Sequence, residues 1–141
     1  MKIKPKTYGP LEVKFRVDDA LTVETEMGNS VRGGLSPAKD ALSPSDLILA
    51  SLASCLAISM RMAARQMSQN LGALEVSAVA IKATDLPNRF GHFEVEVRTE
   101  FTVPNDKTDE LLRRTKEICT ISNTIAAEIV VRLSHTPPSG T

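Results

Sequence analysis

Residues 47–60 form an almost entirely apolar run, and a helix start signal stands directly before it. Ser43 is a suitable N-cap, Pro44 fits the first helical position, and Asp46 completes a Ser-x-x-Asp pattern. We therefore expect a helix from Pro44 to about Gln69. Because its first half is apolar on every side, this helix should be a buried central helix, and its amphipathic second half should emerge at the surface.

Alternation of apolar and polar residues predicts strands on both sides of this helix. A further short strand is expected in the glycine-rich loop before Pro44. Thr108 and Ser122 are expected to cap two more helices, the first ending at about Ile118. The order of strands, long helix, strands, helices and strand favours the α+β class with a largely antiparallel sheet. The alternating ranges are 13–17, 21–27, 74–84, 92–103 and 128–134.

At 141 residues the chain is expected to be one domain, 1–141, with a frayed tail at 135–141. The chain has 17 basic residues (Lys and Arg) and 17 acidic residues (Asp and Glu), so it carries no excess of positive charge that would attract a polyanion. Nucleic acid is therefore not an expected partner. The basic N-terminus lacks the apolar segment of a secretory signal, and the run 47–60 is shorter than a membrane span. We expect a cytoplasmic protein without a membrane partner.

The only two cysteines, Cys55 and Cys119, are candidates for redox chemistry. Buried cysteine commonly acts as a small hydrophobe, so packing is the simpler interpretation of each one alone. Cys55 lies about 18 Å beyond the Ser43 cap, where the helix dipole has faded, so a reactive Cys55 needs a cation from elsewhere. Cys119 precedes an expected helix start, where backbone N–H groups favour a thiolate. Zinc is not expected, because there is no Cys-x-x-Cys motif.

Two motifs carry a resemblance to a known family. The first is Pro44-Ser45-Asp46-Leu47 with the Ala/Ser-rich run into Cys55, and the second is Cys119-Thr-Ile-Ser-Asn. Together with the element order they resemble the OsmC/Ohr family (osmotically inducible protein C and organic hydroperoxide resistance protein). The resemblance implies an α+β, intertwined homodimer with active sites at the subunit interface. It also implies thiol-dependent peroxidase activity without metal, haem or flavin cofactors.

By position, Cys55 matches the family's peroxidatic cysteine and Cys119 its resolving cysteine. The implied cycle reduces an organic hydroperoxide at Cys55, forms a Cys55–Cys119 disulfide, and uses an external dithiol to regenerate both thiols. Such an activity serves oxidative-stress defence. Met60 and Met62 are candidates for an apolar entrance, with gap filling in the core as the simpler role.

The chain departs from the family pattern at the charged pair that activates the reactive cysteine. Ser45 stands where the family has a glutamate, and Asp46 is a candidate substitute besides being a helix-start carboxylate. For the activating arginine we prefer Arg16, with Arg32 also nearby in sequence. The departure favours the broad OsmC-like branch of the family.

Two other functions remain open at this stage. The first is a non-enzymatic OsmC-like dimer that binds a small apolar or thiol-containing ligand. The second is a structural dimer whose cysteines are buried and inert.

Overall fold

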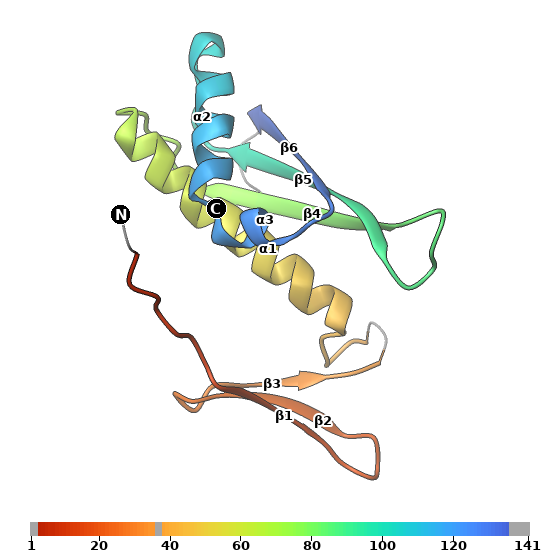
Figure 1. Cartoon of the computed structure of the whole chain (residues 1–141). Coiled ribbons are helices and arrows are strands. Elements are labelled where there is room, and N and C mark those ends of the chain that lie inside the picture. The colour runs from red at the N-terminus through yellow and green to blue at the C-terminus, as the bar shows by residue number, and fades with distance from the viewer. Residues whose placement is uncertain (1–2, 36–37, 136–141) are drawn as a thin grey trace. The chain divides into compact units, whose positions relative to one another are not determined.

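The computed structural model describes residues 3–35 and 38–135 and contains three helices and six strands within them (Figure 1). The chain divides into two compact units, Met1–Leu47 and Ile48–Thr141, and each is described by itself. The α+β class is confirmed, with two three-stranded sheets in place of the single sheet that was expected. The single domain 1–141 stays a prediction.

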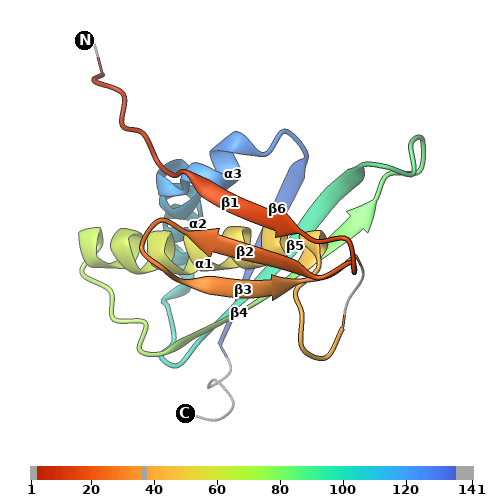
Figure 2. The same cartoon turned by 90° about the horizontal axis from the view of Figure 1, so that it is seen from below.

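The first unit contains an antiparallel meander of β1 (Leu11–Phe15), β2 (Leu21–Thr25) and β3 (Ser30–Gly33), shown in Figure 2. Val13 pairs with Val23, which pairs with Val31, so one face of the meander is apolar. The third strand was expected without bounds, and β1 begins two residues earlier than the predicted range 13–17. Arg16 therefore lies past the strand end, in the β1–β2 turn, where its N–H donates to the carbonyl of Ala20 at 2.8 Å.

Helix α1 (Pro44–Gln66) begins at the predicted capping pattern and ends three residues before the expected Gln69. The Ser43 N–H donates to the Asp46 carboxylate at 2.9 Å, and the Asp46 N–H donates to the Ser43 hydroxyl at 3.1 Å. This reciprocal pair satisfies two amides at the start of the helix. By length and composition α1 could cross a membrane, but core helices of non-membrane proteins share these properties.

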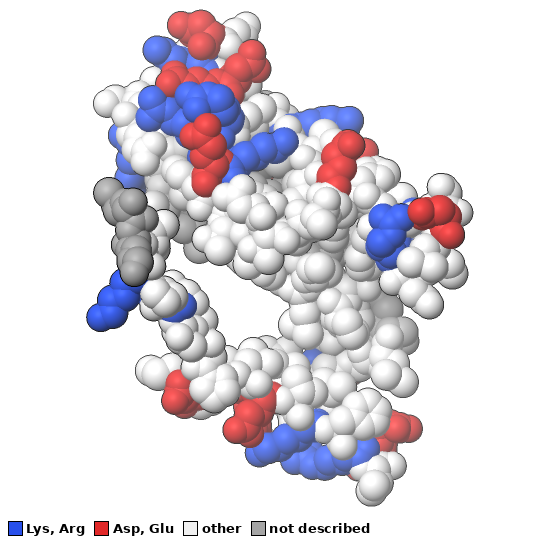
Figure 3. Space-filling model, viewed as in Figure 1, with Lys and Arg blue, Asp and Glu red and all other residues white. Residues whose placement is uncertain are grey.

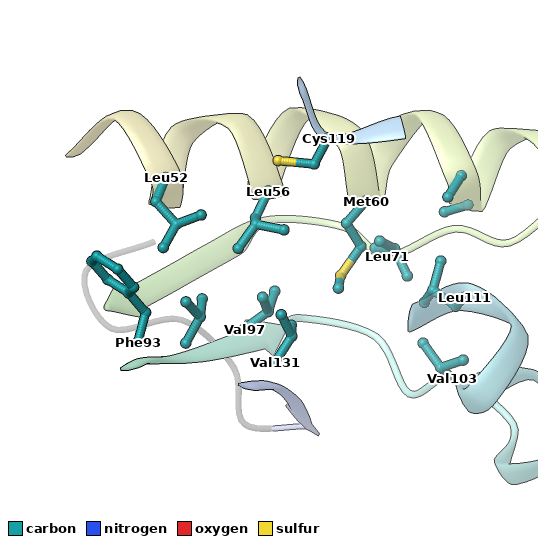
Figure 4. Packing of buried hydrophobic residues seen from close by; sticks show 13 residues of the cluster. Leu52, Leu56, Met60, Leu71, Phe93, Val97, Val103, Leu111, Cys119 and Val131 are labelled. Atoms are coloured by element: carbon teal, nitrogen blue, oxygen red, sulfur yellow. The ribbon is translucent and has the colours of Figure 1, made fainter. Parts of the chain in front are cut away.

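The second sheet consists of β4 (Leu74–Lys82), β5 (Phe90–Thr99) and β6 (Glu128–His135). β4 and β5 are antiparallel, whereas β5 and β6 are parallel, so the fold is largely antiparallel as expected. One side of α1 packs on this sheet, as Figure 4 shows. The side chains that fill the contact include Leu52, Leu56, Met60, Phe93, Val95, Val97 and Val131.

Burial of α1 is therefore one-sided within a single chain. Leu52, Leu56 and Met60 are fully buried, but Ile58 is 63% exposed and Met62 is 46% exposed. The helix that was expected to be buried is therefore buried on the face that meets the sheet, whereas Ile58 on its other side is exposed.

Helix α2 (Asn105–Ile118) and the short helix α3 (Thr120–Thr124) connect β5 to β6. Thr108 does not cap α2 as predicted, because the helix begins three residues earlier and the Thr108 hydroxyl donates to the Pro104 carbonyl. Acidic and basic side chains alternate over α2 in Figure 3. The Arg114 guanidinium forms an ion pair with the Glu110 carboxylate, with 2.8 Å between nitrogen and oxygen. The tail 135–141 was expected to be frayed. His135 is instead the last residue of β6, and residues 136–141 lie outside the described part of the chain.

A candidate dithiol site

Cys55 lies in the middle of α1, at the edge of the face that packs on the sheet. Its side chain is partly exposed, whereas Leu56 next to it and Ser59 one turn later are buried. Residues four apart on a helix are neighbours, so the Ser59 hydroxyl lies near the Cys55 sulfur and lowers the pKa of this thiol. This position leaves Cys55 the more accessible of the two thiols.

Cys119 lies at the break between α2 and α3 and is fully buried. Its backbone is extended, with φ −72° and ψ 105°, so one helix ends and the next begins at this residue. Its sulfur, rather than the predicted Ser122 hydroxyl, caps α3 by accepting the Ser122 N–H at 3.4 Å. The Ser122 hydroxyl lies close to both the sulfur and the carbonyl of Cys119, with a distance of 3.2 Å to the carbonyl oxygen.

The fold brings the two thiols together. Cys119 lies beside α1 near Leu56 (Figure 4), and the Cys55 and Cys119 side chains are close enough for each to shift the pKa of the other. The Ile121 backbone N–H lowers the pKa of both thiols, because it stabilises a negative charge on either sulfur. Both cysteines are free thiols. Two sulfurs in contact, one of them accessible, can be converted to a disulfide by a two-electron oxidant.

The two thiols differ in acidity. Burial, together with the neighbouring Cys119, raises the pKa of Cys55 above the ordinary value, although the Ile121 amide and the Ser59 hydroxyl oppose the rise. Burial also raises the pKa of Cys119, but the hydrogen bonds from Ser122 and from Cys55 outweigh it, and the pKa of Cys119 ends below the ordinary value. The buried sulfur is therefore the more acidic one in the single chain.

A cavity of about 310 Å³ lies over the exposed side of α1 and β4. Met62 lines it, two turns beyond Cys55 and on the same helix face. Met60, the other methionine considered for an apolar entrance, is fully buried in the core and fills space there. The lining residues are Ala57, Ile58, Arg61, Met62, Arg65 and Leu74.

Arg16 and Asp46 belong to the unit Met1–Leu47, so no position relative to the thiols is assigned to them. The Asp46 carboxylate is engaged by the Ser43 amide, and Arg32 pairs with Asp40 at 3.0 Å. The role of Arg16 and Asp46 as charge support for Cys55 stays a prediction.

The sequence analysis missed the contacts that Ser59 and Ser122 make with the sulfurs. The distance in sequence between each serine and its cysteine could have predicted these contacts. Ser59 follows Cys55 by one helical turn, and Ser122 follows Cys119 by the three residues that separate an N-cap from the amide it accepts.

Residues 37–134 match a family model described as OsmC-like protein, and no curated protein matches the chain. Among solved structures, an OsmC-like protein from Mycoplasma pneumoniae is 15% identical with a TM-score of 0.81, covering 94% of this chain and 99% of that one. An organic hydroperoxide resistance protein OsmC from Legionella pneumophila is 19% identical with a TM-score of 0.69, covering 93% and 99%. The organic hydroperoxide resistance protein OhrB of Bacillus subtilis is 17% identical with a TM-score of 0.63, covering 91% and 98%. At these identities the similarity shows a shared fold.

Proposed function

Because the chain belongs to the OsmC-like protein family, we propose that it is a thiol-dependent peroxidase that reduces organic hydroperoxides in oxidative-stress defence. The observation that carries this proposal is the contact between Cys55 and Cys119, which are 64 positions apart in the sequence (119 − 55). The names of the structural relatives from Legionella pneumophila and Bacillus subtilis support the choice of substrate.

The reaction begins at Cys55, the accessible thiol. Its sulfur attacks the O–O bond of the hydroperoxide, leaving a sulfenic acid on Cys55 and releasing an alcohol. Cys119 then attacks the sulfenic sulfur, so that a disulfide forms and water leaves. An external dithiol reduces the disulfide by thiol exchange, and no metal or organic cofactor takes part.

We place the enzyme in the cytoplasm as a homodimer. A transient dithiol couple fits a reducing compartment, and the exposed apolar side of α1 fits a subunit interface. Arg16 and Asp46 remain the proposed charge support for Cys55.

The test compares Cys55→Ser and Cys119→Ser variants with the unchanged protein in a cumene hydroperoxide assay driven by a dithiol. Cys55→Ser should abolish peroxide consumption. Cys119→Ser should accumulate sulfenic acid on Cys55, trapped by dimedone and detected by mass spectrometry. A Cys55→Ser variant that consumes peroxide at the unchanged rate contradicts the proposal.

A second function is favoured by one specific observation, the raised pKa of Cys55 together with serine at position 45. A protonated thiol is a poor nucleophile, which suits a non-enzymatic dimer that binds a small apolar or thiol-containing ligand. If a stoichiometric hydroperoxide forms the intramolecular disulfide within seconds, this alternative is excluded.

A further inference from the structure

The break between α2 and α3 determines where the sulfur of Cys119 lies. We propose that Ser122 is a positioning residue for the resolving step, because its hydroxyl and its main-chain N–H hold Cys119 in the geometry in which the Cys119 sulfur attacks Cys55. The inference rests on the proposed function, which makes Cys119 the resolving thiol, and it gives Ser122 a role in that reaction.

The main chain of Cys119 is held on both sides of the helix break. Its N–H donates to the Thr115 carbonyl at 3.0 Å, the last bond of α2. Its carbonyl accepts the Asn123 N–H at 3.1 Å and the Ser122 hydroxyl at 3.2 Å. The Asn123 side-chain amide also donates to the Glu117 carbonyl at 3.1 Å. These bonds fix an extended residue, with φ −72° and ψ 105°, between two helices.

The side chain of Cys119 is held by the same serine. Its sulfur accepts the Ser122 N–H at 3.4 Å. The side chain is fully buried and lies against α1 beside Leu56, the residue that follows Cys55 (Figure 4). A cysteine side chain has one torsion with three staggered positions, so a hydrogen bond to the sulfur selects among them. Ser122 therefore holds both the carbonyl oxygen and the sulfur of Cys119, and it ties the rotamer of the thiol to the first turn of α3.

Positioning matters in the resolving step because a disulfide tolerates little variation in geometry. The two β-carbons must come within about 3.5–4.5 Å of each other, with a torsion of about 90° around the S–S bond. In this step the Cys119 sulfur bonds to the sulfur of the Cys55 sulfenic acid as the S–O bond breaks. The hydroxyl leaves as water, and its second proton replaces the one that the Cys119 thiol gives to solvent. A Cys119 sulfur in another rotamer points away from this position, so the sulfenic acid persists for longer.

The experiment uses thiol exchange with dithiobis-nitrobenzoate in a stopped-flow spectrometer, because this reagent separates the two steps without a peroxide. The partly exposed Cys55 reacts first, forms a mixed disulfide and releases one thionitrobenzoate. Cys119 then attacks the Cys55 sulfur of the mixed disulfide, so that the intramolecular disulfide forms and a second thionitrobenzoate leaves. The rates of the two releases are compared in the unchanged protein and in single variants at Ser122 and Thr124.

Ser122→Ala should slow the second release about threefold to tenfold, the effect of losing one hydrogen bond, and leave the first release unchanged. Ser122→Thr keeps the hydroxyl and should restore most of the rate. Thr124→Ala is the matched control, because the Thr124 hydroxyl makes the same type of bond within α3, but to the Thr120 carbonyl, at 2.7 Å. Both of its release rates should equal those of the unchanged protein.

The inference is overturned if the second release is unchanged in Ser122→Ala, if it is equally slow in Ser122→Thr, or if Thr124→Ala slows it as much. The last result would show a general loosening of α3. An unchanged protein that releases only one thionitrobenzoate overturns the inference together with the proposed cycle. A protein that shows the expected Ser122 effect but does not reduce cumene hydroperoxide supports the inference and overturns only the proposed function.

Discussion

At the scale of single residues, the site depends on which hydrogen bonds reach each sulfur. Ser59 is buried, and its hydroxyl opposes the effect of burial on Cys55. The Ser122 amide and hydroxyl likewise lower the pKa of Cys119 and so oppose the effect of burial. Because a hydrogen bond to a charged group contributes more than one to a neutral group, each serine favours the thiolate form of its partner.

We expect a Ser59→Ala variant to react more slowly at Cys55. Loss of the hydroxyl raises the pKa of Cys55 further, so the thiolate fraction at neutral pH and the rate of alkylation should fall about threefold to tenfold. The measurement is iodoacetamide labelling of Cys55 at several pH values, followed by mass spectrometry. The rate should increase with pH in both proteins, with the midpoint higher in the variant.

Ser54→Ala is the matched control for this prediction. Ser54 precedes Cys55 directly, but it is exposed and its hydroxyl donates to the Ala50 carbonyl at 2.7 Å. Its removal should leave the labelling rate of Cys55 unchanged. Equal slowing in both variants would show a general effect on the helix and would count against a specific bond from Ser59.

The sequence was informative about each cysteine separately, but less so about the pair. A helix start after Cys119 was expected from the local sequence, although Ser122 rather than Cys119 was predicted as its cap. The contact with Cys55 depends on how α3 packs beside α1. This packing is a tertiary contact, and no short sequence pattern predicts it. It was expected only through the family resemblance. The charge support predicted for Cys55, Arg16 with Asp46, stays a prediction, because Ser45 departs from the family pattern at the position that would identify the pair.

At the scale of secondary structure, the start of α1 is the best-determined feature of the chain. Ser43 and Asp46 form a reciprocal capping pair, and Pro44 occupies the first helical position between them. These signals are local, so the sequence placed this boundary correctly. The start of α2 was predicted at the wrong residue because Thr108 resembles a cap. Thr108 instead lies inside the helix, and its hydroxyl donates to the carbonyl of Pro104, four residues earlier.

Breaking the capping pair should destabilise the protein without affecting its chemistry. Ser43→Ala and Asp46→Ala should each lower the free energy of unfolding by about 1 kcal/mol, and the double variant by less than the sum, because both remove the same pair. Urea denaturation at fixed protein concentration measures the change. Ser45→Ala, at an exposed neighbouring position, should stay within about 0.5 kcal/mol of the unchanged protein.

Asp46→Asn separates the structural role of this residue from the proposed charge support. The amide oxygen can still accept the Ser43 N–H, so the helix start should be retained while the negative charge is lost. Alkylation of Cys55 at the unchanged rate would assign Asp46 to capping alone. A slower rate at unchanged stability would support its proposed role beside an arginine.

At the scale of the whole molecule, each unit of the single chain exposes a row of apolar side chains. On the meander, Val13, Phe15 and Val31 share one face and remain exposed. On α1, Ile58 and Met62 point away from the sheet. Contiguous exposed apolar surface is typical of a subunit interface, which supports the homodimer that the family resemblance implies.

If α1 forms part of that interface, Ile58→Glu should weaken the dimer. A carboxylate at a buried interface position loses its hydration without a partner, so we expect the dissociation constant of the dimer to rise at least about tenfold. Sedimentation equilibrium over a series of concentrations measures it, and circular dichroism checks that the variant is folded. Leu86→Glu is the control, because Leu86 is similarly apolar and 49% exposed but lies in the loop between β4 and β5. Its dissociation constant should stay unchanged. An unchanged protein that sediments as a monomer at every concentration, or two variants that dissociate equally, would contradict an interface on α1.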